Sequence, residues 1–217
     1  MLPGPTIIIK CPHCGQHAKR RTLLSGNTFG ASLWSDFKQI ASMLPDFPQI
    51  VLCKKCNKFY WVKDAKEIDR IWYRYRAEYG GKEKQWADIQ YIEFPTIEEY
   101  QKSLESGAIR KRSEEKYVRV QLWWLFNDNI RGKYSLINLY PNKMNEFNKV
   151  NIEKLFHLLD KKSTTELIMK VEILRNLGRF DESWLLLESI TDKDYFWIRD
   201  KYFNAIKQKN TELFRLR

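Results

Sequence analysis

The chain of 217 residues is poor in the residue types that most catalytic motifs need. It has three histidines and four cysteines, and it contains neither an HExxH pair nor a glycine loop of the kind that holds phosphate. Its acidic residues stand mostly at helix starts or four positions from lysines, as on solvated helix faces. No nucleophile can be matched with a base, so the sequence predicts a protein that is not an enzyme.

Long hydrophobic runs are also missing. The longest apolar stretch near the start, residues 6–9, has the length of a strand, and no run approaches the ~18 residues of a transmembrane helix. The chain begins without a basic and apolar secretion signal. We therefore expect a cytoplasmic protein without a membrane partner, in which 43% hydrophobic and 14% aromatic residues suffice for a folded core.

The four cysteines form two equal pairs, Cys11 with Cys14 and Cys53 with Cys56. Two thiolates three positions apart on a tight loop can point at one ion, and two such loops complete the tetrahedral site that zinc prefers. Gly15 and Asn57 follow the pairs, and both residue types readily adopt the positive φ at which such a loop turns back. Four sulfurs leave no open coordination position, so the predicted role of one zinc ion is structural.

The contexts CPHCG and CKKCN resemble the knuckles of the zinc-ribbon family, over roughly the first quarter of the chain. Iron held by four thiolates, as in rubredoxin, uses the same ligand geometry, so an iron–thiolate redox protein stays open as an alternative. Disulfides are less favoured, because a 26.2 kDa chain does not need them to fold. A thioredoxin-like redox pair would need a single CxxC in a βαβ context.

The spacing of apolar residues changes near residue 63. Before it, short apolar segments predict strands, which lie at residues 7–9, 19–24, 50–52 and 59–62. After it, apolar residues recur at helical spacing. We therefore predict an α+β fold with two domains, a small four-cysteine ribbon at residues 1–63 and a mainly α-helical domain at residues 64–217.

The insert between the two cysteine pairs, residues 25–52, is rich in turn formers. Residues 31–34 and 37–40 are expected to pair as a hairpin, although their aromatic spacing also fits a short helix. Aromatic and cationic side chains alternate here as in proteins that bind single-stranded nucleic acid. A ribbon has little core of its own, so we expect instead that these aromatic residues pack over the metal or against the next domain; they are Trp34, Phe37 and Phe47.

Capping and spacing signals define the helices of the second domain. Thr96 with Glu99 and Ser163 with Glu166 match capping boxes, Gly107 and Gly178 match helix ends, and Asn151 matches an N-cap. The predicted helices cover residues 65–79, 97–106, 114–131, 151–159, 164–177, 180–190 and 194–209. Residues 90–94 are expected to be extended, and residues 132–149 to be a long connection.

One polar stripe of the helix at 114–131 has two readings. Arg119, Asn127, Asp128 and Arg131 lie along it and could form a binding site. We favour a structural role, in which Asp128 pairs with a nearby arginine. Outside this stripe, His13 and His17 lie at the first cysteine pair, and His157 is expected to be a satisfied structural histidine.

Residues 164–190 resemble one tetratricopeptide unit. The spacing of Gly178, Phe180, Ser183 and Leu187 matches the glycine, aromatic, small and large positions of that family. No second copy follows at the ~34-residue period of the family, and an array needs about three units for stability. The resemblance therefore implies an antiparallel helix pair and not a peptide-binding superhelix.

The net charge is +11, and residues 1–61 hold eight Lys and Arg against two Asp and Glu. Phosphate contacts around the cysteine pairs would come from Lys19, Arg20, Arg21, Lys54, Lys55 and Lys58. This predicts nucleic-acid binding as one possible function. The mixed charges elsewhere and the lack of a base-reading element favour another, a non-catalytic adaptor that binds a protein partner of unknown identity.

Overall fold

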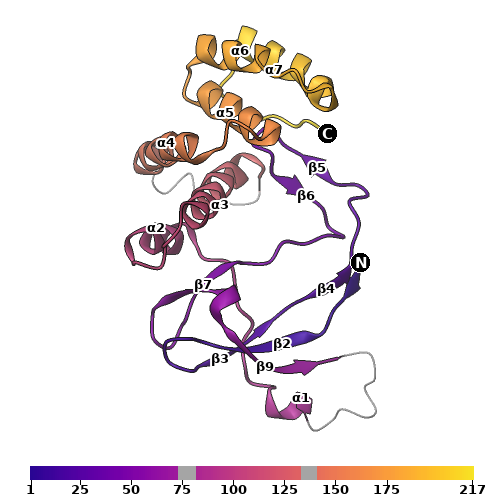
Figure 1. The fold of residues 1–217 in the computed structure, drawn as a ribbon, viewed down its shortest axis with the longest axis vertical. Helices are drawn as coiled ribbons and strands as arrows, with labels where there is room; N and C mark the ends of the chain where they lie inside the picture. The colour runs from indigo at the N-terminus through magenta and orange to yellow at the C-terminus, as the bar shows by residue number, and fades with distance from the viewer. Residues whose placement is uncertain (73–81, 133–140) are drawn as a thin grey trace. The chain divides into compact units, whose positions relative to one another are not determined.

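The computed structural model describes residues 1–72, 82–132 and 141–217 (Figure 1). It has an α+β fold, with short antiparallel strands and the cysteines in the N-terminal part and helices in the C-terminal part. The chain divides into two compact units. The cysteine unit comprises Met1–Gly30 and Ala41–Ile109, and the helical unit comprises Ala31–Ile40 and Arg110–Arg217.

This division differs in two places from the predicted domains, residues 1–63 and 64–217. Residues beyond 63 belong with the strands, because a strand at Lys66–Ile71 pairs with Thr6–Lys10. The hairpin of residues 31–40 belongs with the helices, although it lies in the sequence between the two cysteine pairs.

The described residues of the cysteine unit form three small antiparallel sheets, β1 with β4, β3-β2-β9, and β7 with β8. The strands are β1 (Leu2–Pro3), β2 (Thr6–Lys10), β3 (His17–Arg20), β4 (Leu23–Ser25), β7 (Ile50–Leu52), β8 (Phe59–Trp61) and β9 (Lys66–Ile71). The helices are η1 (Val62–Asp64), α1 (Lys82–Gln85) and α2 (Ile97–Glu105).

Strand β2 is the centre of this unit. Ile7 and Ile9 face a core that also contains the first and third cysteines, whereas Ile8 packs on the opposite face with Ile71 and Trp86. All three isoleucines are buried, because β2 has a neighbouring strand on each side and is covered on both faces. The register pairs Ile8 with Lys19 of β3 and with Asp69 of β9.

The helix predicted at residues 65–79 is wrong where the structure describes it. Residues Lys66–Ile71 form strand β9. The helical spacing of Ile68 and Ile71 would place both inward, but Ile71 is buried and Ile68 is 40% exposed. Pairing with the central strand β2 satisfies the backbone of this segment and outweighs its local spacing. Residues 73–79 of the predicted helix lie outside the described residues.

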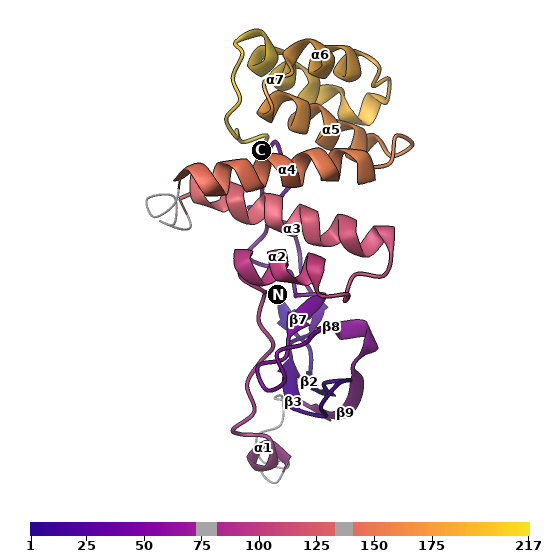
Figure 2. The same cartoon turned by 90° about the vertical axis from the view of Figure 1, so that its left-hand side faces the viewer.

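The helical unit consists of stacked helices and one hairpin. The helices are α3 (Arg112–Ile130), α4 (Pro141–Leu158), α5 (Thr164–Asn176), α6 (Phe180–Glu188), η3 (Lys193–Tyr195) and α7 (Phe196–Lys207), and the hairpin strands are β5 (Ser32–Leu33) and β6 (Gln39–Ile40). Helix α3 packs against α4, α5 against α6, and α6 against α7 (Figure 2). Trp123 and Leu155 are fully buried between α3, α4 and α5, and Tyr202 is fully buried between the later helices.

Helix α4 begins earlier than the sequence signals indicate. The predicted connection of residues 132–149 is wrong from Pro141 onward, and residues 133–140 lie outside the described residues. Pro141 opens α4, where the missing N–H of proline breaks no helical bond. Asn151 is therefore not an N-cap. It is buried inside α4, and its Nδ2 donates to the carbonyl oxygen of Arg119 at 3.0 Å.

Most of the remaining local predictions are confirmed. The capping box of Thr96 is complete, with Glu99 N donating to Thr96 Oγ1 at 3.2 Å and Thr96 N donating to Glu99 Oε2 at 3.1 Å. Ser163 makes half of a box, because the Glu166 side chain accepts instead from Asp160 N. Gly178 ends its helix with a φ of 73°, and residues 90–94 are extended.

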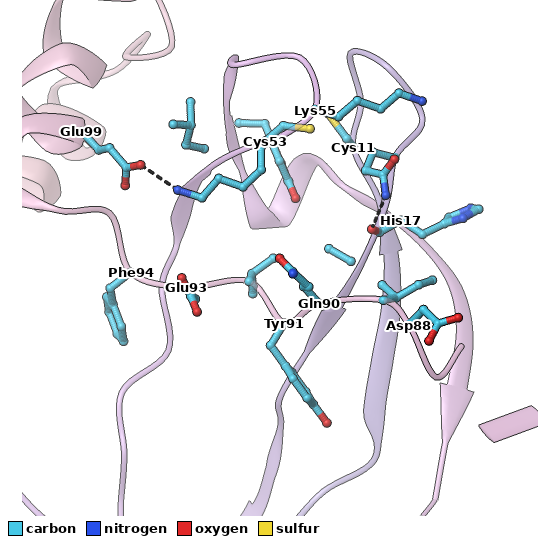
Figure 3. A pocket seen from close by; sticks show the side chains of 17 residues that line it. Cys11, His17, Cys53, Lys55, Asp88, Gln90, Tyr91, Glu93, Phe94 and Glu99 are labelled. Atoms are coloured by element: carbon cyan, nitrogen blue, oxygen red, sulfur yellow. Dashed lines mark hydrogen bonds and ion pairs between the residues drawn. The ribbon is translucent and has the colours of Figure 1, made fainter. Parts of the chain in front are cut away.

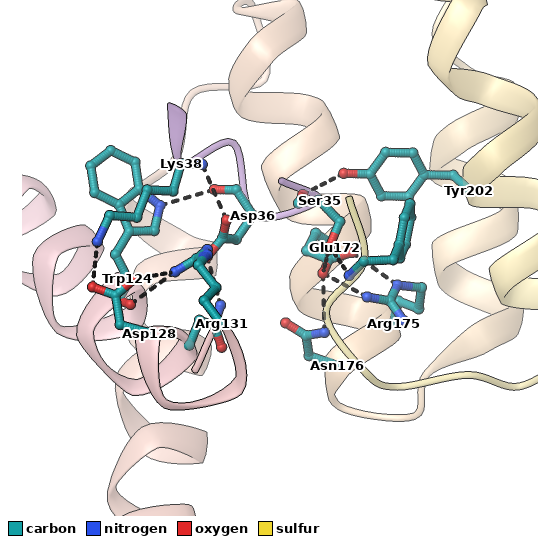
Figure 4. A network of polar contacts seen from close by, with 12 residues as sticks. Ser35, Asp36, Lys38, Trp124, Asp128, Arg131, Glu172, Arg175, Asn176 and Tyr202 are labelled. Atoms are coloured by element: carbon teal, nitrogen blue, oxygen red, sulfur yellow. Dashed lines mark hydrogen bonds and ion pairs between the residues drawn. The ribbon is translucent and has the colours of Figure 1, made fainter. Parts of the chain in front are cut away.

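The hairpin is confirmed, and its tip is fixed in the helical unit by buried polar contacts (Figure 4). The carboxylate of Asp36 accepts from Asn127 Nδ2 at 2.7 Å and pairs with Arg131. Arg131 also pairs with Asp128 at 2.7 Å, and Asp128 pairs with Lys38 at 2.6 Å. The structural reading of this stripe of α3 is confirmed, since Asp128 pairs with an arginine as expected.

A second polar cluster holds the other side of the hairpin tip. Ser35 Oγ donates to Glu172 Oε1 at 2.7 Å, and Glu172 pairs with Arg175 at 2.6 Å. The hydroxyl of Tyr202 donates to the carbonyl oxygen of Ser35. Phe37 packs against the cores on both sides of α5, as expected for an aromatic residue that covers a neighbouring domain.

Candidate metal centre

Each cysteine pair lies on a loop that follows a strand, Cys11 after β2 and Cys53 after β7. The two loops have matching backbone bonds. Gly15 N donates to Cys11 O at 3.0 Å, and Asn57 N donates to Cys53 O at 2.8 Å. As predicted, Gly15 and Asn57 turn the loops back with φ of 75° and 51°. The same local conformation therefore directs both pairs toward one point.

The structure brings the four sulfur atoms within 4.8 Å of one another. Cys11 Sγ lies 4.0 Å from Cys56 Sγ, and Cys14 Sγ lies 3.6 Å from Cys53 Sγ. Four sulfurs at the ~2.3 Å bond length of zinc thiolates would lie ~3.8 Å apart at the corners of a tetrahedron. These two separations fall on either side of that value, so the donor set fits a tetrahedral metal ion. Zinc and iron share this ligand geometry.

The thiols differ in their surroundings. Burial raises the pKa of the Cys11 thiol to about 12, and burial also raises the pKa of Cys56. Cys14 is exposed, and a hydrogen bond from the backbone N–H of Gln16 lowers its pKa to about 7. A metal ion binds thiolates, so loading this site releases protons, and Cys14 loses its proton more readily than Cys11 or Cys56.

The cluster of possible metal ligands contains the four cysteines and none of the three histidines. His13 Nε2 lies 3.1 Å from the carbonyl oxygen of Phe59, which fixes the ring at the second cysteine loop. His17 packs edge-on against Trp86, with ring centroids 5.2 Å apart. His157 is exposed on the helical unit, where its ring meets Phe156 edge-on with ring centroids 5.6 Å apart. The expectation of a satisfied structural histidine there stays a prediction.

A cavity of about 560 Å³ lies beside the metal centre within the cysteine unit (Figure 3). Cys11 and Cys53 reach its edge, and the extended segment 88–94 forms much of the rest. At one side Lys54 Nζ pairs with Glu99 Oε1 at 2.8 Å. The lining carries charges of both signs, and this mixture favours no single class of ligand.

Sequence reasoning did not find this cavity, because segment 88–94 reaches it through long-range pairing. Lys19 N donates to Gln90 O at 2.9 Å, and Ile92 N donates to Lys19 O at 2.8 Å. These bonds add the segment to the free edge of β3 in parallel orientation. Its sequence indicates an extended conformation and contains no signal for the strand beside which it lies.

The six cations proposed for phosphate contacts are in different states. Lys19 Nζ donates to Ala87 O at 3.0 Å, and Lys54 is paired with Glu99. The guanidinium of Arg21 lies 4.3 Å from the ring centre of Tyr91. Arg20 is half-buried, whereas Lys55 and Lys58 are exposed on the second cysteine loop. Lys19, Arg21 and Lys54 therefore already contact other groups of the protein. The exposed cations of the second cysteine loop are Lys55 and Lys58.

A row of aromatic side chains on α6 and α7 was not found from the sequence either. The rings of Trp184 and Phe203 lie 4.5 Å apart, and the guanidinium of Arg199 lies 5.4 Å from the ring centre of Phe203 and 5.1 Å from that of Phe196. Trp184 is 36% exposed and Phe196 is 42% exposed. We call these four residues the aromatic row. In the parts of the chain that the structure describes, no element covers this side of α6 and α7, so the row stays partly exposed.

Within the described parts of the chain, no helix combines the length and the apolar character needed to cross a membrane. Comparisons with protein families, with curated proteins and with solved structures find no match to this chain.

Proposed function

We propose that the protein is a non-catalytic zinc-binding adaptor, in which one zinc ion stabilises the cysteine unit and a protein partner binds the aromatic row. The observation that carries the proposal is the row itself, a contiguous set of partly exposed aromatic rings linked by Arg199. A four-sulfur site has no open coordination position, so its contribution is to folding and not to the activation of a water molecule.

The chemistry of the aromatic row supports protein binding. Tryptophan, phenylalanine and arginine are enriched where proteins meet, and the residues that contribute most to affinity are often tryptophan or arginine. Two large aromatic side chains in the row, Trp184 and Phe196, are more than one third exposed. Contact between these exposed aromatic rings and water is unfavourable. A partner that covers the rings removes this contact, which stabilises the complex.

The metal is tested by elemental analysis of the purified protein and of Cys53→Ser. We expect about one zinc per chain in the wild type and loss of the metal in the variant, because three thiolates no longer close the tetrahedron. Ser25→Ala, an exposed position outside the centre, is the control and should keep its zinc. A full complement of iron with visible thiolate-to-metal absorption would instead establish the iron–thiolate alternative.

The partner is tested by affinity capture of the full chain with quantitative comparison of variants. Phe196→Ala and Trp184→Ala should each reduce recovery of a specific partner about tenfold or more, as expected for residues central to an interface. Phe29→Ala is the matched control, because Phe29 is 84% exposed and lies in the cysteine unit. Partners that all three variants retain equally would contradict the adaptor proposal. Circular dichroism confirms that each variant is folded.

Nucleic-acid binding through the cysteine unit is the second candidate, and the exposed Lys55 and Lys58 favour it. Titration with single- and double-stranded DNA and RNA across a salt series tests it. Each phosphate contact should steepen the log–log salt dependence by ~0.7–0.9. Charge reversal at Lys55 and Lys58 is cleaner than at Lys54, which already pairs with Glu99. Binding that this reversal abolishes would replace the adaptor proposal.

A further inference from the structure

A hollow of about 840 Å³ lies within the helical unit, between the start of α3 and the loop that joins α4 to α5. Its lining is strongly cationic. Five of its nine lining residues are basic and one is acidic. The basic residues are Lys111, Arg112 and Lys116 from α3 and the turn before it, and Lys161 and Lys162 from the loop.

The fold itself uses two of these cations. Arg112 donates to the carbonyl oxygen of His157 in the last turn of α4, where a cation is favoured by the helix dipole. Lys116 Nζ pairs with Glu166 Oε1 at 2.7 Å. The ammonium groups of the other three, which are Lys111, Lys161 and Lys162, are exposed and make no ion pair with a described residue. Structural roles therefore leave most of the positive charge uncompensated.

A buried lysine nearby responds to this charge. Lys170 is 3% exposed, and its ammonium group donates to the carbonyl oxygen of Phe156. Its pKa is lowered by burial first and then by the charges of Lys161 and Arg112. The opposing charges of Glu166 and Asp160 do not cancel the effect. The region of the hollow therefore has a positive potential that an anion would neutralise.

We propose that this hollow binds a free oligophosphate, through Lys111, Lys161 and Lys162 together with Arg112. The cations approach from two sides, so a ligand with several phosphate groups meets more of them than a single phosphate does. Among the described lining residues none is aromatic, and only Leu158 and Leu159 are apolar. The hollow therefore offers no aromatic ring on which a base would stack, and its five basic side chains favour binding through the phosphate groups.

The test is calorimetric titration of the full chain with inorganic tripolyphosphate at low and at physiological salt. We expect binding by the wild type and about a hundredfold weaker binding by Lys161→Ala/Lys162→Ala, since each of the two lost charge-assisted hydrogen bonds weakens affinity about tenfold. The control is Lys149→Ala/Lys207→Ala. It removes the same charge from exposed positions of the helical unit that do not line the hollow, and its affinity should stay within about twofold of the wild type.

Two results would overturn the proposal: no binding at millimolar tripolyphosphate, or equal weakening by both double variants, which marks a general charge effect. A single-stranded oligonucleotide forms a second arm. If it binds through Lys161 and Lys162 while tripolyphosphate does not, the ligand is a nucleic-acid backbone and the proposal fails. Lys111→Ala, from the other side of the hollow, repeats the test with a variant that leaves the loop unchanged. None of these variants changes the aromatic row, so the result for the hollow is independent of the proposed adaptor function.

Discussion

Tyr202 shows how a single residue links the hairpin to the helices. Its side chain is fully buried, and its hydroxyl donates to the carbonyl oxygen of Ser35 at the hairpin tip. Burial raises the pKa of Tyr202 well above its ordinary value, and Glu172 and Asp36 raise it further, against the opposing effect of Arg175. The folded protein therefore holds the proton of this phenol more strongly than the unfolded chain does.

This difference predicts a loss of stability at alkaline pH. The unfolded tyrosine titrates near pH ~10, whereas the folded one stays protonated above that pH, so the stabilisation is complete below pH ~10 and declines as the pH rises beyond it. Below pH ~10, Tyr202→Phe should cost about 1–3 kcal/mol, because the carbonyl of Ser35 loses its donor. Thermal unfolding of both proteins from pH 8 to 11 checks this. If the stability difference between the wild type and Tyr202→Phe does not shrink above pH ~10, the prediction is contradicted.

The buried ion pair at Asp36 is a second residue on which stability depends. The side chains of Asp36 and Arg131 are 0% and 1% exposed. Removal of one partner leaves an uncompensated buried charge, so Asp36→Ala should destabilise the helical unit by about 3–5 kcal/mol. Glu182→Ala removes an exposed partner of Arg179, whose attraction water screens, and should lower the free energy of unfolding far less. Urea unfolding measures the free energy of unfolding of both variants. An equal loss in the two variants would show that burial does not make the Asp36 pair more important for stability than an exposed pair.

For helices and strands, the sequence signals that predict the structure correctly are those whose hydrogen-bonding partners lie within a few residues. Thr96 caps α2 because its hydroxyl and the Glu99 carboxylate satisfy each other's backbone donors. Asn151 has a similar sequence context but lies in the middle of α4, where Arg119 of α3 satisfies its side chain. A capping residue therefore marks a helix start only where no neighbouring element satisfies it first.

The capping box makes a prediction about α2. Thr96→Ala removes the acceptor for Glu99 N and should destabilise the cysteine unit by about 1 kcal/mol. Thr28→Ala, at an exposed position of the same unit with no cap to lose, should change stability by less than about 0.5 kcal/mol. The midpoint of chemical unfolding of the metal-loaded protein distinguishes the two. The same shift in both variants would argue against the cap.

For the whole molecule, the division into two units decides what the metal does. Cys11 and Cys53 are part of the buried core of the cysteine unit, next to Ile7, Ile9 and Tyr60. The cores of the helical unit contain no cysteine among their described residues. A metal ion bound by the four cysteines would thus cross-link one unit and leave the other to fold around apolar and polar contacts of its own.

Removal of the metal should accordingly affect the units differently. A strong chelator under reducing conditions should abolish the ordered amide signals of the cysteine unit, because its small core would lose the cross-link that a bound ion supplies. The helical circular dichroism signal should largely persist, since α3 to α7 and the hairpin tip need no metal. Amide NMR spectra with circular dichroism, before and after chelation, check both parts. Complete loss of the helical signal would contradict independent folding of the helical unit.

Features that depend on near neighbours in the chain can be predicted from the amino-acid sequence. The two cysteine pairs with Gly15 and Asn57, the hairpin around Ser35 and Asp36, and the capped helices each satisfy their own backbone within a few positions. The α+β class follows from them, because a metal-centred set of strands precedes a run of amphipathic helices. Local chemistry and final structure agree at these places since no distant partner competes.

The pairing of distant segments and the exposure of surfaces depend on tertiary packing, which local sequence patterns do not encode. Strand β9 exists because β2 needs a second neighbour, and the hairpin belongs to the helical unit because Asn127, Arg131 and Glu172 bind its tip. The aromatic row and the cationic hollow are exposed because no described element covers the outer side of α6 and α7 or the gap before α3. Periodicity identifies which residues are apolar, but burial depends on which element comes to lie beside them.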